Sequence, residues 1–189
     1  EVKPIEIVAS YATFANKGIY STPIAITRIE DKYGRIIKEY SIDQKEVLSP
    51  ETAYMVTNLL QSVIDKGTGG SIRWRHKFRH PAGGKTGTTQ NTSDAWFVGF
   101  TPNITAGVWY GLDQYSTSLG KGQYGGVAAL PAWAKFMKKA HQELNIPKDD
   151  FEIPSGVVEI EIDADTKLLP TNRTKNLEKE YFLKSNVPQ

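Results

Sequence analysis

The residues with the clearest capacity for chemistry lie in one short segment, 83–89, with the sequence GGKTGTT. A lysine cation and several hydroxyls follow one another along a β-prone stretch, which suits the binding of a substrate carboxylate. Alternate side chains of a strand face opposite sides, so we expect Lys85 and Gly87 on one face and Thr86 and Thr88 on the other. Because glycine has no Cβ, Gly87 would let a ligand approach the backbone closely.

Serine acyl transfer needs a nucleophile, a base, donors for the oxyanion and a device that orients the substrate. The lysine segment can supply the last two. If it forms a strand edge beside a cleft, it offers the N–H of Thr88 to an oxyanion and its hydroxyls to a carboxylate. A lone Lys-Thr-Gly triplet recurs by chance, so the flanking residues decide its meaning.

The flanks extend the pattern well beyond the triplet. Residues 94–102 follow the lysine motif with DAWFVGFTP, 9–20 read ASYATFANKGIY, and 107–113 read GVWYGLD. Together these stretches resemble the transpeptidase domain of penicillin-binding proteins, most closely the bifunctional class A type. The stretch from Ile153 to Asp163 is similar to the extension that follows this domain in class A members.

The resemblance implies a D,D-transpeptidase that crosslinks peptidoglycan stem peptides through a serine acyl-enzyme and is inhibited by β-lactams. It implies catalytic roles for Lys85, whose charge positions the substrate and supports proton transfer, and for Thr88, whose N–H completes the oxyanion hole. It also implies substrate contacts at Thr86, Gly87, Thr88 and Thr89, which would bind the terminal D-Ala-D-Ala of a stem peptide or a β-lactam.

Two further family motifs, S-x-x-K and S-x-N, should precede the lysine strand, and neither is found there. Ser118-Leu119-Gly120-Lys121 fits the first pattern, but it follows the lysine motif in a glycine-rich loop, whereas the nucleophile needs a rigid helix start. We therefore expect the nucleophile and the base in an upstream part of the same polypeptide, and no activity from this chain by itself.

Other functions are compatible with the same motif. With water as the acceptor the site would belong to a D,D-carboxypeptidase or a β-lactamase-like hydrolase. Outside the enzyme classes, the domain could be a non-catalytic β-lactam sensor or scaffold. Whether a glycosyltransferase domain precedes the chain is left open.

Composition narrows the class of protein. The 189 residues are 39% hydrophobic and 23% charged, as in a soluble globular domain, and a net charge of +2 is too small to indicate nucleic acid as a partner. There is no cysteine, and the histidines His76, His80 and His141 lack zinc-ligand spacing, so neither metal nor cofactor is expected. No apolar run approaches the roughly 20 residues that cross a bilayer. The resemblance places the domain at the extracytoplasmic (periplasmic) face of the cell membrane, with an anchor outside this chain.

Periodicity and turn residues predict an α/β (α+β) fold, in which helices cover an antiparallel sheet, as in the penicillin-binding protein and β-lactamase-like transpeptidase fold, incomplete in this chain. The expected helices are 5–16, 50 to about 67 and 127–144; the expected strands are 85–89, 95–101, 105–112 and 158–162; a hairpin is expected within 22–40, a flexible connector at 67–70, and loops at 72–81 and 115–126. We expect a transpeptidase part at 1–147 and an extension at 148–189.

Several conspicuous residues have simpler interpretations than a role in chemistry. The aromatic residues Trp96, Phe97, Trp109 and Tyr110 are typical of core or sheet surface. Asp94 is expected to cap the turn at Asn91. The basic cluster is expected to be a solvated loop near the cleft, and it comprises Arg73, Arg75, His76, Lys77, Arg79 and His80.

Overall fold

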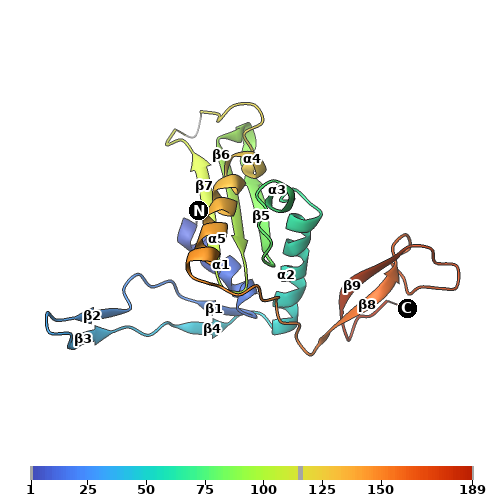
Figure 1. Ribbon diagram of the computed structural model, residues 1–189, viewed down its shortest axis with the longest axis horizontal. Coiled ribbons are helices and arrows are strands. Elements are labelled where there is room, and N and C mark those ends of the chain that lie inside the picture. Colours follow the sequence, from blue (N-terminus) through green and yellow to red (C-terminus); the bar gives the residue numbers. More distant parts are fainter. Residues whose placement is uncertain (1, 115–116, 189) are drawn as a thin grey trace.

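A three-stranded antiparallel sheet, in the order β5-β6-β7, forms the centre of the molecule (Figure 1). The structure is a computed structural model that describes residues 2–114 and 117–188. The helices are α1 (Pro4–Ala15), α2 (Pro50–Asp65), α3 (Ser71–Trp74), α4 (Gly125–Ala128) and α5 (Leu130–Glu143), with a 3₁₀ turn at Gln90–Thr92. The strands are β1 (Ile19–Ser21), β2 (Arg28–Glu30), β3 (Ile36–Glu39), β4 (Gln44–Glu46), β5 (Gly83–Thr88), β6 (Asp94–Phe100), β7 (Thr105–Gly111), β8 (Val157–Asp163) and β9 (Leu177–Leu183).

The register of the sheet confirms the three predicted strands and their antiparallel pairing. Lys85 lies opposite Val98 and Thr86 opposite Phe97, while Val98 lies opposite Gly107 on the other side. Short turns join the three strands, as antiparallel neighbours require.

Helices α1 and α5 cover opposite faces of this sheet. A Cβ at Gly99 would lie 2.8 Å from the Trp133 ring of α5, whereas one at Gly107 would lie 2.7 Å from Val8 of α1. Gly99 pairs with Ala106, and Gly107 with Val98, so the two contacts fall on alternate residues and hence on opposite faces.

The face toward α5 holds the main core. Leu130, Trp133 and Met137 are fully buried there, and the Trp133 indole donates to the carbonyls of Gly99 and Ala106. The buried cluster also includes Ile64, Ile72, Phe78, Ala82, Phe97, Ala129 and Ala134. Helix α5 begins at Leu130, three residues later than expected, because Pro131 starts a new helix after the short α4.

The prediction of a loop at 72–81 is wrong in two respects: the segment begins within a helix, and two of its side chains are buried. Residues Ser71–Trp74 form α3, and both Ile72 and Phe78 are fully buried. The sequence does not predict this burial, because the two apolar side chains show no periodic spacing. They fill the space between α2 and α5. The connector before it is a hydrogen-bonded turn, in which Gly69 N–H donates to Val63 O at 2.9 Å and Gly70 N–H to Gly67 O at 3.1 Å.

Two hairpins extend away from this body (Figure 1). The first contains the predicted turn, where the Asp31 carboxylate accepts the N–H groups of Tyr33 and Arg35, between β2 and β3. Closer to the body, β1 pairs with β4. These two short strands were not predicted.

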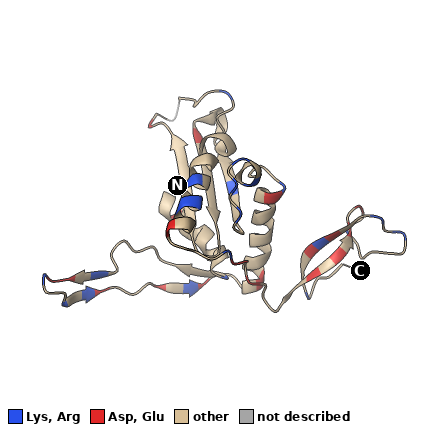
Figure 2. Ribbon diagram, viewed as in Figure 1, with Lys and Arg blue, Asp and Glu red and all other residues tan. Residues whose placement is uncertain are grey.

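The second hairpin pairs β8 with β9. Only β8 was predicted, because β9 reads as a charged segment, LEKEYFL, on a two-stranded ribbon with little to bury. Both hairpins contain charged residues of both signs (Figure 2). The predicted loop at 115–126 lies partly outside the described residues, at 115 and 116, and its predicted end is wrong, because α4 begins at Gly125.

Candidate functional site

Strand β5, which carries the lysine motif, is the outermost strand on its side of the described sheet. At its end the Thr89 N–H donates to Asp94 O at 3.1 Å, so residues 89 and 94 form a hydrogen-bonded pair. Such pairs alternate with non-bonded ones along an antiparallel ladder. The backbone polar groups of Thr86 and Thr88 are therefore turned away from β6, toward the open edge.

A small pocket lies beside Lys85. It has a volume of about 190 Å³ and is lined by Ile7, Tyr11, Lys85, Thr86, Gly87, Trp96 and Val98. Ile7 and Tyr11 come from α1, so the first helix forms one wall. A Cβ at Gly87 would lie 3.2 Å from the Cβ of Trp96 and 4.0 Å from its Cγ, so a side chain there would press against Trp96. The absence of a side chain at Gly87 thus keeps space open next to Lys85.

The ammonium group of Lys85 lies at the rim of this pocket. Lys85 is exposed, and its Nζ donates to the outward-facing carbonyl of Thr86 at 2.9 Å. No ion pair is formed by Lys85 within residues 2–114 and 117–188. A cation held on the strand edge without a carboxylate partner there can attract an anionic ligand.

The hydroxyls of Thr86 and Thr88 project from the other face of the strand, as the alternation predicted. Gly125 N–H donates to Thr88 Oγ1 at 3.2 Å, and Thr86 Oγ1 lies 3.2 Å from Thr68 Oγ1. A Cβ at Gly125 would lie 2.3 Å from Trp96 O and 2.7 Å from Gly87 O, so only glycine fits where this turn crosses the sheet. Two segments from outside the strand therefore fix the hydroxyls.

Thr89 differs from the other motif residues because its hydroxyl is engaged in the β5–β6 turn. Its Oγ1 accepts the Asp94 N–H at 2.8 Å and lies 2.9 Å from Ser93 Oγ. The Asp94 side chain is buried in the same network and accepts the Trp109 indole N–H at 2.8 Å. The expected capping of the Asn91 turn is wrong, because within the described residues the Asp94 carboxylate accepts from the Thr89 and Ser93 hydroxyls and from Trp109 rather than from a backbone N–H of that turn. Asp94 thereby connects the turn to β7, which the sequence did not indicate.

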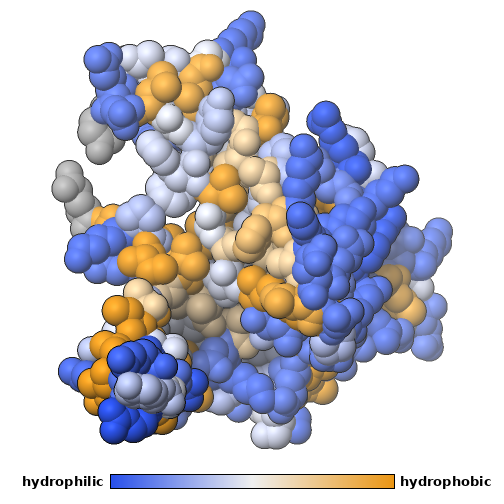
Figure 3. All heavy atoms as spheres, turned by 60° about the vertical axis from the view of Figure 1, so that its left-hand side comes forward, coloured by the Kyte–Doolittle hydropathy of each residue, from blue (hydrophilic) through white to orange (hydrophobic). Residues whose placement is uncertain are grey.

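The four aromatic residues of β6 and β7 divide by position. Phe97 is fully buried in the core, as expected, while Trp96 is half-buried and lines the lysine pocket. Trp109 and Tyr110 are exposed on β7. On the face shown in Figure 3, hydrophobic side chains are accessible in patches between hydrophilic ones.

The basic cluster is only partly solvated, in contrast to the prediction. The Arg73 guanidinium pairs with Asp65 at 2.7 Å and donates to the carbonyls of Phe78 and His80, at 3.1 and 2.7 Å. Its role is to hold the buried segment that leads into β5. His141 is a satisfied core histidine, with Nε2 3.0 Å from Thr101 Oγ1 and Nδ1 2.8 Å from Met137 O.

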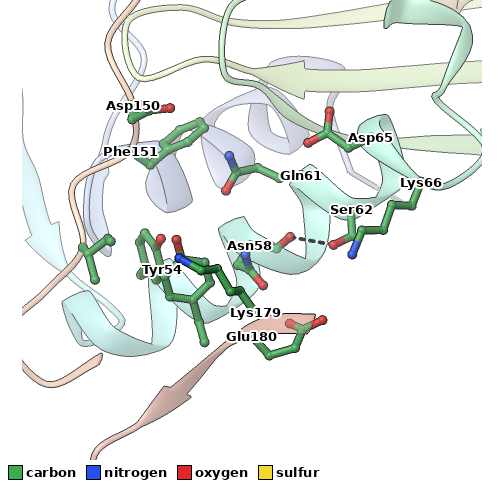
Figure 4. Close-up of a pocket in the computed structure, with 12 residues that line it drawn as sticks. Tyr54, Asn58, Gln61, Ser62, Asp65, Lys66, Asp150, Phe151, Lys179 and Glu180 are labelled. Carbon is green, nitrogen blue, oxygen red and sulfur yellow. Dashed lines mark hydrogen bonds between the residues drawn. The ribbon is translucent and has the colours of Figure 1, made fainter. Parts of the chain in front are cut away.

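A larger pocket, of about 310 Å³, lies between α2 and β9 (Figure 4). Two of its charged groups are paired with side chains outside the pocket lining: Lys179 with Glu159, and Asp65 with Arg73. The Ser62 hydroxyl donates to Asn58 O, as the figure shows, and burial together with the Tyr181 hydroxyl raises the pKa of Tyr54. It therefore offers neither an activated nucleophile nor an open strand edge, and we place the functional site at β5.

Metal binding and membrane insertion find no support in the described part of the chain. Within it, no three side chains of His, Asp or Glu gather in a way that could hold a metal ion. None of its helices is both long and apolar enough to cross a bilayer.

Residues 1–138 match the family model of the penicillin binding protein transpeptidase domain. The chain belongs to this family. The fold agrees: a penicillin-binding protein 1A from Haemophilus influenzae superposes with a TM-score of 0.89 at 27% identity, covering 100% of this chain and 33% of that one.

Relatives of this chain at a similar level of sequence identity are also penicillin-binding proteins. A penicillin-binding protein 1A of Clostridium novyi is 32% identical over 95% of this chain. The PonA1 protein from Mycobacterium tuberculosis in complex with penicillin V has a TM-score of 0.62 at 24% identity, over 79% of this chain and 40% of that one. The chain spans about a fifth of the length of the curated Clostridium relative, at 20%.

Sequence reasoning missed four residues of this site. Ile7 and Tyr11 stand one helical turn apart, so helix periodicity could have placed them on one face of α1. Thr68 and Gly125 gave no such signal, because they reach β5 from segments 18 and 37 residues away.

Proposed function

We propose that this chain supplies the lysine strand of a serine D,D-transpeptidase that crosslinks peptidoglycan stem peptides and is acylated by β-lactams. One observation carries the proposal: β5 presents an open edge on which the Thr88 N–H points outward, beside an exposed Lys85 and a pocket. Substrate peptide can lie along such an edge, because the unpaired backbone groups of an edge strand accept a further extended chain.

Each group of the motif has a role in this proposal. The hydroxyls of Thr86 and Thr88 donate to the terminal carboxylate of the peptide, and Lys85 adds a positive charge beside it. The serine oxygen attacks the carbonyl carbon that precedes the terminal D-Ala, and the Thr88 N–H donates to the oxyanion that develops there. The base, which has taken the serine proton, passes it to the D-Ala nitrogen as the bond to that nitrogen breaks. An acceptor amine then attacks the acyl-enzyme, its proton is passed through the base to the departing serine oxygen, and the crosslink forms.

We assign the nucleophile and the base to polypeptide upstream of this chain. Ser118 does not meet the requirement, since it lies in a loop where its Oγ contacts Thr92 Oγ1 at 2.8 Å, with no helix start beside it. The solved complex of PonA1 with penicillin V concerns a protein of this fold, and it supports β-lactams as ligands here. We also propose an extracytoplasmic location, anchored outside this chain, and a division into a transpeptidase part and a C-terminal extension; truncation tests whether the boundary lies at the predicted residue 147.

Acylation of the full-length protein by a fluorescent penicillin tests the proposal. We expect Lys85→Ala to slow labelling by about 100-fold or more, as the loss of an electrostatic group at the reacting centre does elsewhere. Lys77→Ala removes another exposed lysine, eight residues earlier in the chain, and should label at the wild-type rate. A wild-type protein with an intact upstream serine that never labels would refute the assignment.

The products formed from a pentapeptide substrate identify the acceptor. A transpeptidase releases D-Ala and forms a crosslinked dimer when a second stem peptide is present. Repeated release of D-Ala without a dimer would instead indicate a carboxypeptidase, and a stable acyl-enzyme that releases no more than about one D-Ala per protein would indicate a sensor.

A further inference from the structure

We propose that Thr68, in the turn after α2, is a positioning residue that directs the hydroxyl of Thr86 toward the substrate carboxylate. This role rests on the proposed function of β5 as the substrate-binding strand. Thr68 lies 18 residues before Thr86, outside the lysine motif.

Thr68 is in contact with the strand through its hydroxyl. Its Oγ1 lies 3.2 Å from Thr86 Oγ1, and both hydroxyls are in reach of solvent, since Thr68 is exposed and Thr86 is half-buried. The turn at Gly126 closes the other side: a Cβ there would lie 3.3 Å from Thr68 O and 3.8 Å from Thr86 Cγ2. Thr68 thus stands at the place where the turn after α2, β5 and the turn before α5 meet.

The turn that carries Thr68 is held firmly against α2. Gly69 N–H donates to Val63 O at 2.9 Å, and Gly70 N–H donates to Gly67 O at 3.1 Å. Cβ atoms at Gly67 and Gly69 would lie 2.9 and 3.1 Å from Val63 O, so the glycines let the turn pack tightly on the last turn of the helix. A hydroxyl on such a turn can fix the rotamer of a neighbour.

The direction of the hydrogen bond follows from the count of donors. A threonine hydroxyl has one proton to donate and can accept through its lone pairs. If Thr86 gives its proton to a carboxylate, the contact with Thr68 persists only when Thr68 donates to Thr86. Donation to Thr86 also polarises that hydroxyl and strengthens the bond that it makes to an anion. Thr88 is in the same situation, because it accepts from Gly125 N–H and keeps its own proton.

Thr68 could instead have a purely structural role, in which its hydroxyl only holds the turn against the strand. Loss of a structural contact would affect every ligand of the site, whereas loss of a positioning hydroxyl would affect only ligands that carry the carboxylate. The comparison of a penicillin with its methyl ester therefore separates them.

The test measures second-order rates of acylation of the full-length protein by a penicillin and by the methyl ester of the same penicillin. We expect Thr68→Val to slow acylation by the free acid by about 2- to 10-fold, the range of one hydrogen bond, with no change for the ester. Thr68→Ser retains the hydroxyl and should restore the rate. Thr27→Val replaces an exposed threonine on the β2–β3 hairpin and serves as the matched control.

Equal rates for Thr68→Val and the wild type, or equal slowing for acid and ester, would overturn the role of Thr68. In a Thr86→Val background the Thr68→Val change should have no further effect, and an undiminished effect there would also overturn it. A wild-type protein that labels with neither compound would overturn the proposed function itself, which the other results leave standing.

Discussion

At the scale of single residues, the lysine strand separates two kinds of functional group by face. Lys85 and Gly87 face α1 and a small pocket, whereas Thr86 and Thr88 face the turns at Thr68 and Gly125. The N–H groups of Thr86 and Thr88 point to the open edge. A ligand along that edge would therefore meet the cation, the amide and the hydroxyls from three directions, which is the arrangement that fixes an orientation.

A pair of histidines joins the segment before β5 to α5. The rings of His80 and His141 have centroids 4.4 Å apart, and Phe78 stacks on His80 at 5.3 Å. Burial, with His141 close by, holds the pKa of His80 below its ordinary value of 6.5. Burial likewise lowers the pKa of His76.

This depressed pKa predicts the sign of the pH dependence of stability. As the pH falls below about 6.5, the unfolded chain takes up protons while the folded protein keeps His80 neutral, so stability falls until the folded pKa is reached. We expect a lower Tm at pH 5.5 than at pH 7.5, and a smaller difference for His80→Phe, in which His76 maintains part of the effect. Thermal unfolding at the two pH values measures this. A His80→Phe variant with the full wild-type difference would contradict it.

At the scale of elements, the local sequence predicted the start of α2 correctly. Helix α2 starts at Pro50, and the Ser49 Oγ accepts the Thr52 N–H at 3.2 Å. The same local reasoning missed α3, β1, β4 and β9, which are short and owe their form to the segments beside them. Capping residues are informative because the groups that they satisfy lie within one turn.

Removal of this cap is expected to destabilise α2 and β5, the strand that packs on it. We expect Ser49→Ala to lower the free energy of unfolding by about 1 kcal/mol, because the Thr52 N–H loses its acceptor at the helix start. Ser49→Asp supplies another acceptor and should remain close to the wild type. Urea unfolding followed by tryptophan fluorescence measures both. Equal stability of the Ala and Asp variants would show that the cap contributes nothing.

At the scale of the whole molecule, the C-terminal hairpin is attached to the body by a few aromatic contacts. Tyr181 of β9 packs edge-to-face on Tyr54 of α2, with centroids 5.3 Å apart. Before the hairpin, Phe151 packs on Phe100 of β6 at 5.6 Å. The segment 148–154 therefore contacts the transpeptidase body, although it lies beyond the predicted boundary at residue 147.

Two truncations test where the extension begins. We expect loss of residues 148–189 to be more destabilising than loss of 155–189, by about 1 kcal/mol or more, because only the longer deletion removes the Phe151 contact. Tm values of the two truncated proteins measure the difference, and Phe151→Ala in the full-length protein should reproduce part of it. If both truncations had the same Tm, a boundary at 147 would be favoured.

The sequence by itself determined the family, the three central strands, the start of α2 and the faces of the lysine strand. These features depend on residues close together in the chain, where side-chain periodicity, capping and turn chemistry act. Only the tertiary structure decided that β5 has an open edge, that Thr89 belongs to a turn, and that Thr68 and Gly125 reach the motif threonines. Those contacts join residues that are distant in sequence. They form when whole elements pack together, and such packing leaves no local pattern in the sequence.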